Sequence, residues 1–339
     1  MRILLLTGGE SSEREVSLAS GNSINAALKR LDHEVLVVDP LWSKSLKGRE
    51  TLYVDDGASS ESLPADNALT LKLTDVLGRG DIPDIDCVFV GLHGGSGENG
   101  TIQSVLQLAN MKFTGSSMTA SAVAMDKAIS KRLFESVGIK TPRFELRRIE
   151  EEFVPYGIVR ELAERFNLPI IVKPNDGGST VGLTKVEEVE DLHPALVSAR
   201  EESPNVLIEE YIPGREVTVS VLNGEALPVV EIIPESGLYD YEAKYTKGKS
   251  EYVVPADIFP EIAERLQKAA VDAYNVIGAS GLARVDFILA QNRDFYCLEL
   301  NTLPGMTDLS LAPMAAKSAG IEFDELIQKI IDAAVGGQE

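Results

Sequence analysis

Basic residues are scarce in this chain, and their scarcity excludes whole classes of partner. The 339 residues contain 32 lysines and arginines against 53 aspartates and glutamates, which gives a formal net charge of −21. Nothing in this balance attracts a polyanion, so we expect no binding to nucleic acid and none to an anionic membrane surface. A nucleotide, if one binds, must be held by a few local cations and a metal ion.

Cysteines and long apolar runs are also few. Cys87 and Cys297 each lie in an apolar, strand-like run and show no metal-ligand spacing, so we expect buried free thiols and a cytoplasmic location. No apolar run approaches the ~18 residues of a membrane span. The apolar start, MRILLLTGGE, is too short for a secretion signal and lacks a cleavage pattern.

What the chain does contain is an ordered alternation of strand and helix signals. The predicted strands are 2–7, 33–39, 85–92, 112–115, 168–173 and 183–186, and the predicted helices are 12–31, 101–109, 121–137, 156–167, 189–202, 260–277, 310–319 and 323–334. This alternation is typical of an α/β protein that begins with a parallel, Rossmann-like sheet. From residue 206 onward the pattern becomes antiparallel, with turns at Pro213-Gly214 and Asn223-Gly224, which predicts an α+β C-terminal part.

These changes of pattern divide the chain into three predicted domains, 1–115, 116–205 and 206–339. The third contains a long polar loop at 234–255, and loops of that length are usually functional lids or disordered segments.

The stretch from 281 to 305 carries the clearest local prediction. Two runs of strand-forming residues, Leu282–Ala290 and Phe295–Asn301, flank the turn residues 291–294. In a hairpin, the numbers of two paired residues have a fixed sum, which the position and length of the loop determine. We expect a two- or four-residue loop centred on Asn292-Arg293.

That register pairs Asp286 with Glu299 and Arg284 with Asn301, and the alternation of side chains places all four on one face. Two carboxylates directly opposite each other repel. A bound Mg²⁺ would remove this repulsion, because carboxylate and amide oxygens are the ligands it prefers. The alternative is that Arg284 neutralises the pair on a solvated face, and the hairpin alone leaves both interpretations open.

Other polar residues stand where ligands are often bound. Lys173 ends a predicted strand before a glycine-rich loop, PNDGGSTVG, which suits a phosphate cradle but is also an ordinary hairpin turn. Lys127 lies on a predicted helix, and Lys131 one turn later is expected to be a surface residue. His93 follows a strong strand, at the end where open α/β sheets bind ligands.

Acidic residues are ambiguous in the same way. Glu13 and Glu15 stand at a predicted helix start, where the helix dipole alone would favour them. Glu209 and Glu216 flank a short turn and could bind an adenine edge and ribose hydroxyls, although each is a weak signal by itself.

Taken together, these stretches resemble the D-alanine–D-alanine ligases of the ATP-grasp superfamily. The resemblance runs in order through TGGESSEREVSL, GLHGGSGENG, SAVAMDK, VKPNDGGSTVG, LIEEYIPGREVTV, YDYEAKY, GLARVDFIL and ELNTLPGMTDLSLAPMAA. So many motifs in one order, along nearly the whole chain, are not expected by chance.

The resemblance implies an ATP-grasp fold behind an N-terminal Rossmann-like domain, with ATP held between the second and third domains. It implies that ATP phosphorylates one D-alanine and that the amine of a second attacks the acyl phosphate, which yields D-alanyl-D-alanine, ADP and phosphate for peptidoglycan synthesis. It also implies two Mg²⁺ or Mn²⁺ ions, K⁺ as a further cation, and a homodimer.

The same resemblance assigns roles to residues of this chain. The metal ligands implied are Asp286, Glu299 and Asn301. The ATP-binding residues implied are Lys127, Lys173, Ser179, Glu209, Glu210, Ile212, Glu216 and Lys244. The catalytic residues implied are Glu15, Ser179, Tyr245, Arg284 and Gly305, and the substrate-binding residues implied are Glu15, His93, Arg284, Ser310 and Leu311. Within these sets, Arg284 and the N–H of Gly305 match an oxyanion-stabilising pair, and Glu15, Ser179 and Tyr245 match a triad that ties the lid to the first domain.

Some positions depart from the family, and rival functions remain. Asn99 replaces a common aspartate, Glu210 replaces a common lysine, and Asp176 brings a carboxylate into the glycine-rich loop. A D-alanine–D-lactate ligase is disfavoured by Tyr245, because relatives with that activity replace it. A non-catalytic nucleotide-binding protein is disfavoured by the complete metal-ligand set. An ATP-grasp ligase for other amino acids is disfavoured by Glu15, Tyr245 and Ser310 as a set.

Overall fold

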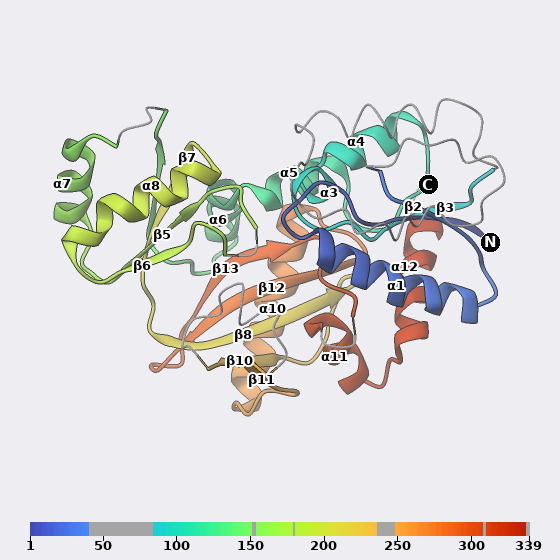
Figure 1. The fold of residues 1–339 in the computed structure, drawn as a ribbon. Helices are drawn as coiled ribbons and strands as arrows, with labels where there is room; N and C mark the ends of the chain where they lie inside the picture. The colour runs from blue at the N-terminus through green and yellow to red at the C-terminus, as the bar shows by residue number, and fades with distance from the viewer. Residues whose placement is uncertain (41–83, 151–153, 179, 236–247, 308–309, 337–339) are drawn as a thin grey trace.

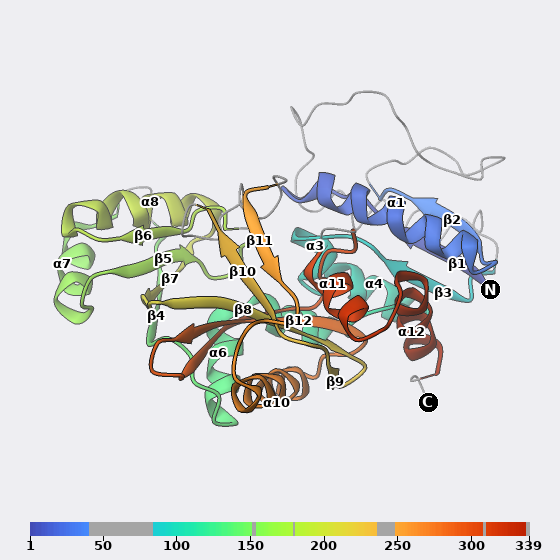
Figure 2. The ribbon, with the colours of Figure 1, turned by 90° about the horizontal axis from the view of Figure 1, so that it is seen from below.

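The described part of the chain folds around three separate sheets. The computed structural model describes residues 1–40, 84–150, 154–178, 180–235, 248–307 and 310–336 (Figure 1). Both views place the sheet with β8 and β12 between the N-terminal sheet and the four-stranded sheet (Figures 1 and 2). The predicted α/β architecture, with an antiparallel C-terminal part, is confirmed.

The N-terminal sheet is parallel, in the order β2-β1-β3. Its strands are β1 (Arg2–Leu6), β2 (Glu34–Val38) and β3 (Cys87–Val90), and the helices around it are α1 (Arg14–Arg30), α3 (Gly95–Glu98), α4 (Thr101–Leu108) and α12 (Phe323–Gly336). Strand residues alternate between two apolar clusters, one shared with α1 and α12 and the other with α4. The last helix of the chain therefore helps to cover the first sheet.

The four-stranded sheet is antiparallel, in the order β4-β7-β5-β6. Its elements are β4 (Phe144–Arg148), α7 (Tyr156–Arg165), β5 (Ile170–Pro174), β6 (Thr184–Val186), a 3₁₀ turn (Val189–Asp191), α8 (Leu192–Glu202) and β7 (Asn205–Glu210). Ile170 and Val172 pack under α7 and α8. Because side chains alternate along a strand, Lys173 lies on the opposite face.

The third sheet is antiparallel, in the order β11-β10-β8-β12-β13, with β9 on β8. Its strands are β8 (Gly214–Leu222), β9 (Glu225–Ala226), β10 (Val230–Pro234), β11 (Ser250–Val253), β12 (Leu282–Ala290) and β13 (Phe295–Asn301), and its helices are α5 (Met118–Met125), α6 (Lys127–Ser136), α10 (Pro260–Ile277) and α11 (Leu311–Ser318). α5, α6 and α10 share one apolar cluster with β8, β12 and β13. The strand β7, just after the predicted boundary at 205, pairs within the four-stranded sheet; the three-domain division stays a prediction.

Three predicted elements differ from the structure. In the long loop predicted at 234–255, the residues Ser250–Val253 form β11 and pair with β10. The single helix predicted over 121–137 is two helices, because Asp126 leaves helical geometry and its carboxylate accepts the N–H of Ile129 at 2.9 Å, which caps α6. The strand predicted at 112–115 is only a bridge between Val88 and Phe113. There the N–H of Val90 bonds to the Thr114 hydroxyl instead of to a backbone carbonyl.

The predicted hairpin has the right strands and, at the end that contains Arg284 and Asp286, the right pairs. Arg284 faces Asn301 and Asp286 faces Glu299. The predicted loop length was wrong: Ala290 bonds to Asp294 across a three-residue turn. The register then shifts by one residue at a β-bulge after Asp286, and this shift restores the predicted pairing near the site.

Candidate functional site

A cavity of about 490 Å³ opens where the three sheets approach one another. Its walls include every described residue of the predicted site, namely Glu15, His93, Lys127, Lys173, Glu209, Glu210, Ile212, Glu216, Arg284, Asp286, Glu299, Asn301, Gly305, Ser310 and Leu311. Ser179, Lys244 and Tyr245 lie outside the described residues, as does most of the predicted lid. The residues predicted from the sequence come from the whole chain, and the fold brings those that are described to one place.

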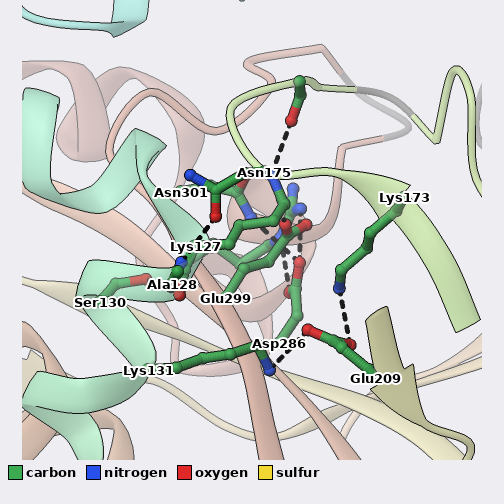
Figure 3. A network of polar contacts seen from close by, with 12 residues as sticks. Lys127, Ala128, Ser130, Lys131, Lys173, Asn175, Glu209, Asp286, Glu299 and Asn301 are labelled. Atoms are coloured by element: carbon green, nitrogen blue, oxygen red, sulfur yellow. Dashed lines mark hydrogen bonds and ion pairs between the residues drawn. The ribbon is translucent and has the colours of Figure 1, made fainter. Parts of the chain in front are cut away.

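Lys173 and Glu209 form the centre of one wall, on the face of the four-stranded sheet turned away from its helices. The Lys173 ammonium lies 2.9 Å from one Glu209 oxygen, and Lys131 lies 2.9 Å from the other (Figure 3). The surface position predicted for Lys131 was wrong, because its side chain is fully buried. Its signal in the sequence was its place one turn from Lys127 and three residues before the buried Phe134, on the inward face of α6.

The start of α6 is fastened to the glycine-rich loop. The side-chain oxygen of Asn175 accepts the N–H of Ala128 at 2.9 Å, and the backbone carbonyl of Asn175 accepts the N–H of Lys127. The Lys127 ammonium donates to the carbonyl of Gly177 at 2.6 Å and lies 3.3 Å from Glu299 (Figure 3). Lys127 is thus a buried cation at the cavity wall rather than a solvated helix residue.

Asp286 receives hydrogen bonds from three side chains, one on its own strand and two on neighbouring strands. Arg284 donates twice, at 2.9 and 2.8 Å, Thr218 donates at 2.6 Å, and the Asn301 amide donates at 3.0 Å. The neutralising role that the sequence left open for Arg284 is therefore visible.

The donor set nevertheless fits a hard dication. Two carboxylates, Asp286 and Glu299, and one amide, Asn301, share a face of the hairpin that opens into the cavity, and oxygen donors of this kind suit Mg²⁺. Within the described ranges no cluster of three or more His, Cys, Asp or Glu side chains could hold a metal, so the amide is needed to complete the set.

His93 links the first sheet to the loop after β13. One ring nitrogen lies 2.9 Å from the Leu303 carbonyl and the other 3.0 Å from the Ser20 hydroxyl, which accepts the N–H of Met306. Burial lowers the pKa of His93, and a neutral ring that donates to Leu303 and accepts from Ser20 satisfies every group. His93 therefore positions the chain leading to Gly305, in addition to lining the cavity.

Glu98 is a site residue that sequence reasoning missed. Its carboxyl accepts the N–H of Gly94 at 3.2 Å and that of Leu303 at 3.3 Å. Burial raises its pKa to about 7, and the nearby Glu13 acts in the same direction. Both backbone groups of Leu303 are thus held by the loop after β3. The neighbouring departure, Asn99, accepts the N–H of Thr101 at the start of α4.

Gly305 and Ser310 approach each other closely at the far end of the cavity. A Cβ atom on Gly305 would come within 2.8 Å of the Ser310 hydroxyl oxygen. That hydroxyl accepts the N–H of Thr307 at 2.9 Å. Ser310 immediately precedes α11, whose first residue is Leu311.

Two acidic residues at the start of α1 line the cavity, and one of them lies beside the glycine-rich loop. Glu15 is exposed on the first turn of α1 and lines the cavity. The Glu13 carboxylate lies so near both Gly94 and Gly178 that a Cβ on either would come within 3 Å of it. Glu13 was passed over in the sequence because a helix-start carboxylate has an ordinary explanation.

The remaining predicted contacts lie at the end of β7, at the start of β8 and on the segment between them. Glu210 is exposed, Ile212 and Glu216 are half-buried, and all three line the cavity. Between them, the Tyr211 ring lies 4.5 Å from the Lys185 ammonium, a cation–π contact that links this segment to β6.

Comparison with known proteins matches the chain over almost its whole length. A family model described as D-ala D-ala ligase N-terminus matches residues 2–116, and one described as D-ala D-ala ligase C-terminus matches residues 133–332. A D-alanine–D-alanine ligase from Gloeobacter violaceus is 41% identical over 336 residues, which cover 99% of this chain and 100% of that protein.

Solved structures give the same picture. The D-alanine–D-alanine ligase of Bacillus anthracis complexed with ATP has a TM-score of 0.77 and 30% identity, covering 99% of this chain and 98% of its own. The VanG D-Ala:D-Ser ligase of Enterococcus faecalis has a TM-score of 0.79 and 29% identity, covering 98% of this chain and 99% of its own.

Proposed function

Because the chain belongs to the D-alanine–D-alanine ligase family, we propose that it joins two D-alanines with ATP, through a D-alanyl phosphate, to supply a peptidoglycan precursor. The observation that carries the proposal is the cavity, whose walls combine cationic, metal-ligating and substrate-binding candidates from all three sheets. A carboxylate is a poor electrophile, and phosphorylation gives it a leaving group. Phosphoryl transfer is then chiefly a matter of positioning and charge neutralisation.

In this proposal, the nucleotide lies against the four-stranded sheet. Lys127 and Lys173 face the phosphates, and the glycine-rich loop offers backbone N–H groups beside them. The segment from Glu209 to Ile212 borders the adenine, and Glu216 is placed for the ribose. Ser179 and Lys244 complete the ATP site as predictions from the sequence.

We also propose that Asp286, Glu299 and Asn301 hold two Mg²⁺ or Mn²⁺ ions, with K⁺ as a further cation. A divalent ion there neutralises phosphate charge when bound. The three side chains supply the oxygen donors, while Arg284 and Lys127 already offset the two carboxylates from either side.

The acyl half of the reaction falls to the other end of the cavity. Arg284 and the N–H of Gly305 would stabilise the oxyanion formed when the second amine attacks. Glu15 and His93 border the first D-alanine, and Ser310 with Leu311 borders the carboxylate of the second. Tyr245, as part of the lid, would exclude water that hydrolyses the acyl phosphate.

The decisive experiment is ADP release from ATP and Mg²⁺ with D-alanine, L-alanine, D-serine and D-lactate compared as substrates. We expect ADP release that depends on D-alanine, with D-alanyl-D-alanine as the dominant product at neutral pH. The likeness to a D-Ala:D-Ser ligase makes D-serine the informative second substrate. Ester product from D-lactate, a mixed dipeptide with D-serine as the main product, or no D-alanine dependence would each overturn the proposal.

The metal assignment has its own test in Asp286→Asn. Because the amide lacks the charge of the carboxylate, we expect a sharply higher Mg²⁺ concentration for half-maximal ADP release, with the protein still folded by circular dichroism. Asp272→Asn, which changes a half-buried aspartate paired with Lys268 on α10, is the matched control. An unchanged Mg²⁺ requirement in Asp286→Asn would contradict the ligand assignment.

Location and assembly remain proposals as well. No helix in the described part of the chain is long and apolar enough to cross a membrane, and we propose a cytoplasmic homodimer. Light scattering during size-exclusion chromatography measures the mass directly, and a single-chain mass at micromolar concentration would argue against the dimer.

A further inference from the structure

Lys131 has no role in the site described so far, yet its environment is unusual. Its side chain is fully buried. The ammonium donates to the Thr141 hydroxyl at 2.8 Å and lies 5.9 Å from the centre of the Phe144 ring. Lys131 does not line the cavity, so it cannot touch a ligand there. Burying an ammonium is costly, and its only acidic neighbour among the contacts described is Glu209.

Glu209 is shared between two lysines. One carboxylate oxygen lies 2.9 Å from Lys131 and the other 2.9 Å from Lys173 (Figure 3). Burial by itself would raise the pKa of Glu209, but the two lysines outweigh it and hold the pKa below its usual value. Burial lowers the pKa of Lys131, and the ionised Glu209 opposes that lowering. The three groups therefore form one buried unit, with a single carboxylate between two amines.

The two lysines differ in what lies beyond them. Lys131 is enclosed by protein, whereas Lys173 lines the cavity beside the glycine-rich loop. If Glu209 had Lys173 as its only partner, the pair would be neutral and Lys173 would be held back from an anion by its own carboxylate. A second amine on the protein side changes this balance, because the carboxylate is already compensated when an anion arrives.

We propose that Lys131 is a positioning residue for nucleotide binding: it holds and neutralises Glu209 from the protein side, so that the Lys173 ammonium keeps its charge for the phosphates. This inference rests on the proposed function, because it presumes that the anion in the cavity is a nucleotide. It also gives α6 two tasks, since Lys127 faces the cavity directly and Lys131, one turn later, acts through Glu209.

The test is a charge-balance experiment. ADP with Mg²⁺ is titrated calorimetrically into the wild type, Lys131→Met, and the double variant Lys131→Met/Glu209→Gln. We expect Lys131→Met to weaken ADP binding about tenfold or more, because Glu209 then competes for Lys173. We expect the double variant to bind ADP more tightly than Lys131→Met, because its Lys173 has no carboxylate to satisfy. The D-alanine concentration for half-maximal velocity at saturating ATP should change little in both.

The control is Lys268→Met, which makes the same substitution at an exposed lysine on α10 and should leave binding unchanged. If Lys131 mattered only for packing, removing the charge of Glu209 as well would not restore binding. Equal ADP affinity in Lys131→Met and the wild type, or no gain in affinity of the double variant over Lys131→Met, overturns the inference. If Lys131→Met does not fold, the double variant is compared with Glu209→Gln, and a further loss of ADP affinity on removing Lys131 from that background overturns the inference. Absence of ADP binding by the wild type would instead contradict the proposed function.

Discussion

At Gly305, the lack of a side chain allows the backbone to approach the Ser310 hydroxyl. That hydroxyl is also bonded to the N–H of Thr307 and lies 2.9 Å from the Thr307 hydroxyl, so it has little freedom to move aside. The same residue is proposed to offer its N–H to the oxyanion and to leave room for the group that binds the second substrate. Glycine here is a requirement of close approach rather than of an unusual backbone angle.

Gly305→Ala should therefore impair catalysis more than folding. The new Cβ would come within 2.8 Å of the Ser310 oxygen, so we expect kcat/KM for D-alanine to fall at least tenfold while the free energy of unfolding changes by less than about 1 kcal/mol. Steady-state ADP release and urea denaturation measure the two effects. The control is Gly157→Ala in α7, where no atom lies within 4 Å of the added Cβ. Normal kinetics in Gly305→Ala would show that Ser310 can shift without consequence.

Among the elements, α6 shows how a local pattern and a functional position coincide. Periodicity predicted one helix over 121–137, but the cap at Asp126 starts a new helix whose first residue is Lys127. A capping aspartate inside an apolar pattern looks like any other polar residue in a helix, so the sequence could not separate the two. The break matters, because it brings the N-terminus of α6, with Asn175 bonded to it, to the glycine-rich loop.

Removal of that cap should lower the stability of the protein and weaken nucleotide binding. We expect Asp126→Ala to lower the free energy of unfolding by about 1 kcal/mol and to raise KM for ATP, because Lys127 is the next residue. Glu135→Ala, at an exposed position of the same helix, should change neither measurably. Unaltered urea denaturation of Asp126→Ala would mean that the Asn175 contacts alone hold the start of α6.

Across the whole molecule, Leu303 is where the first sheet and the loop after β13 are joined. His93 lies against its carbonyl and Glu98 accepts its N–H. Sequence reasoning placed His93 at the right end of its strand but could not see this second function, because the partner is 210 residues away. Contacts at such separation depend on the packing of whole domains, which local patterns do not encode.

This junction should give the protein a pH-dependent stability. The carboxyl of Glu98 has a pKa of about 7 in the fold against an ordinary value of 4.5, so the native state binds its proton more tightly than the unfolded chain does. Its ionisation therefore costs stability as pH rises from 4.5 to 7, by up to about 1.4 kcal/mol per pH unit. Glu98→Gln should remove this loss, so that its stability relative to the wild type improves across that window.

Urea denaturation at several pH values measures the difference, with the exposed Glu188→Gln as the control that should run parallel to the wild type. Parallel profiles for Glu98→Gln would mean that the carboxyl titrates at its ordinary value.

The hairpin of β12 and β13 shows most clearly what the sequence could and could not predict. Both strands begin and end where the residue pattern predicted, since apolar and turn-forming residues mark their limits. The bulge beside Asp286 left no comparable mark, because any residue can be the extra one. The surface position predicted for Lys131 was wrong for a related reason: the burial of Lys131 depends on Glu209, which comes from another sheet.

The bulge also has a consequence for parity. With the observed three-residue turn and no bulge, Asp286 would face Leu298, and Glu299 would point to the opposite side of the sheet. The three residues of the turn and the one extra residue of the bulge make four residues in all. Because side chains alternate along a strand, only an even number of such residues leaves both carboxylates on the face that lines the cavity. Turn and bulge are therefore coupled, so that loss or gain of one residue at either place can be tolerated only with a matching change at the other.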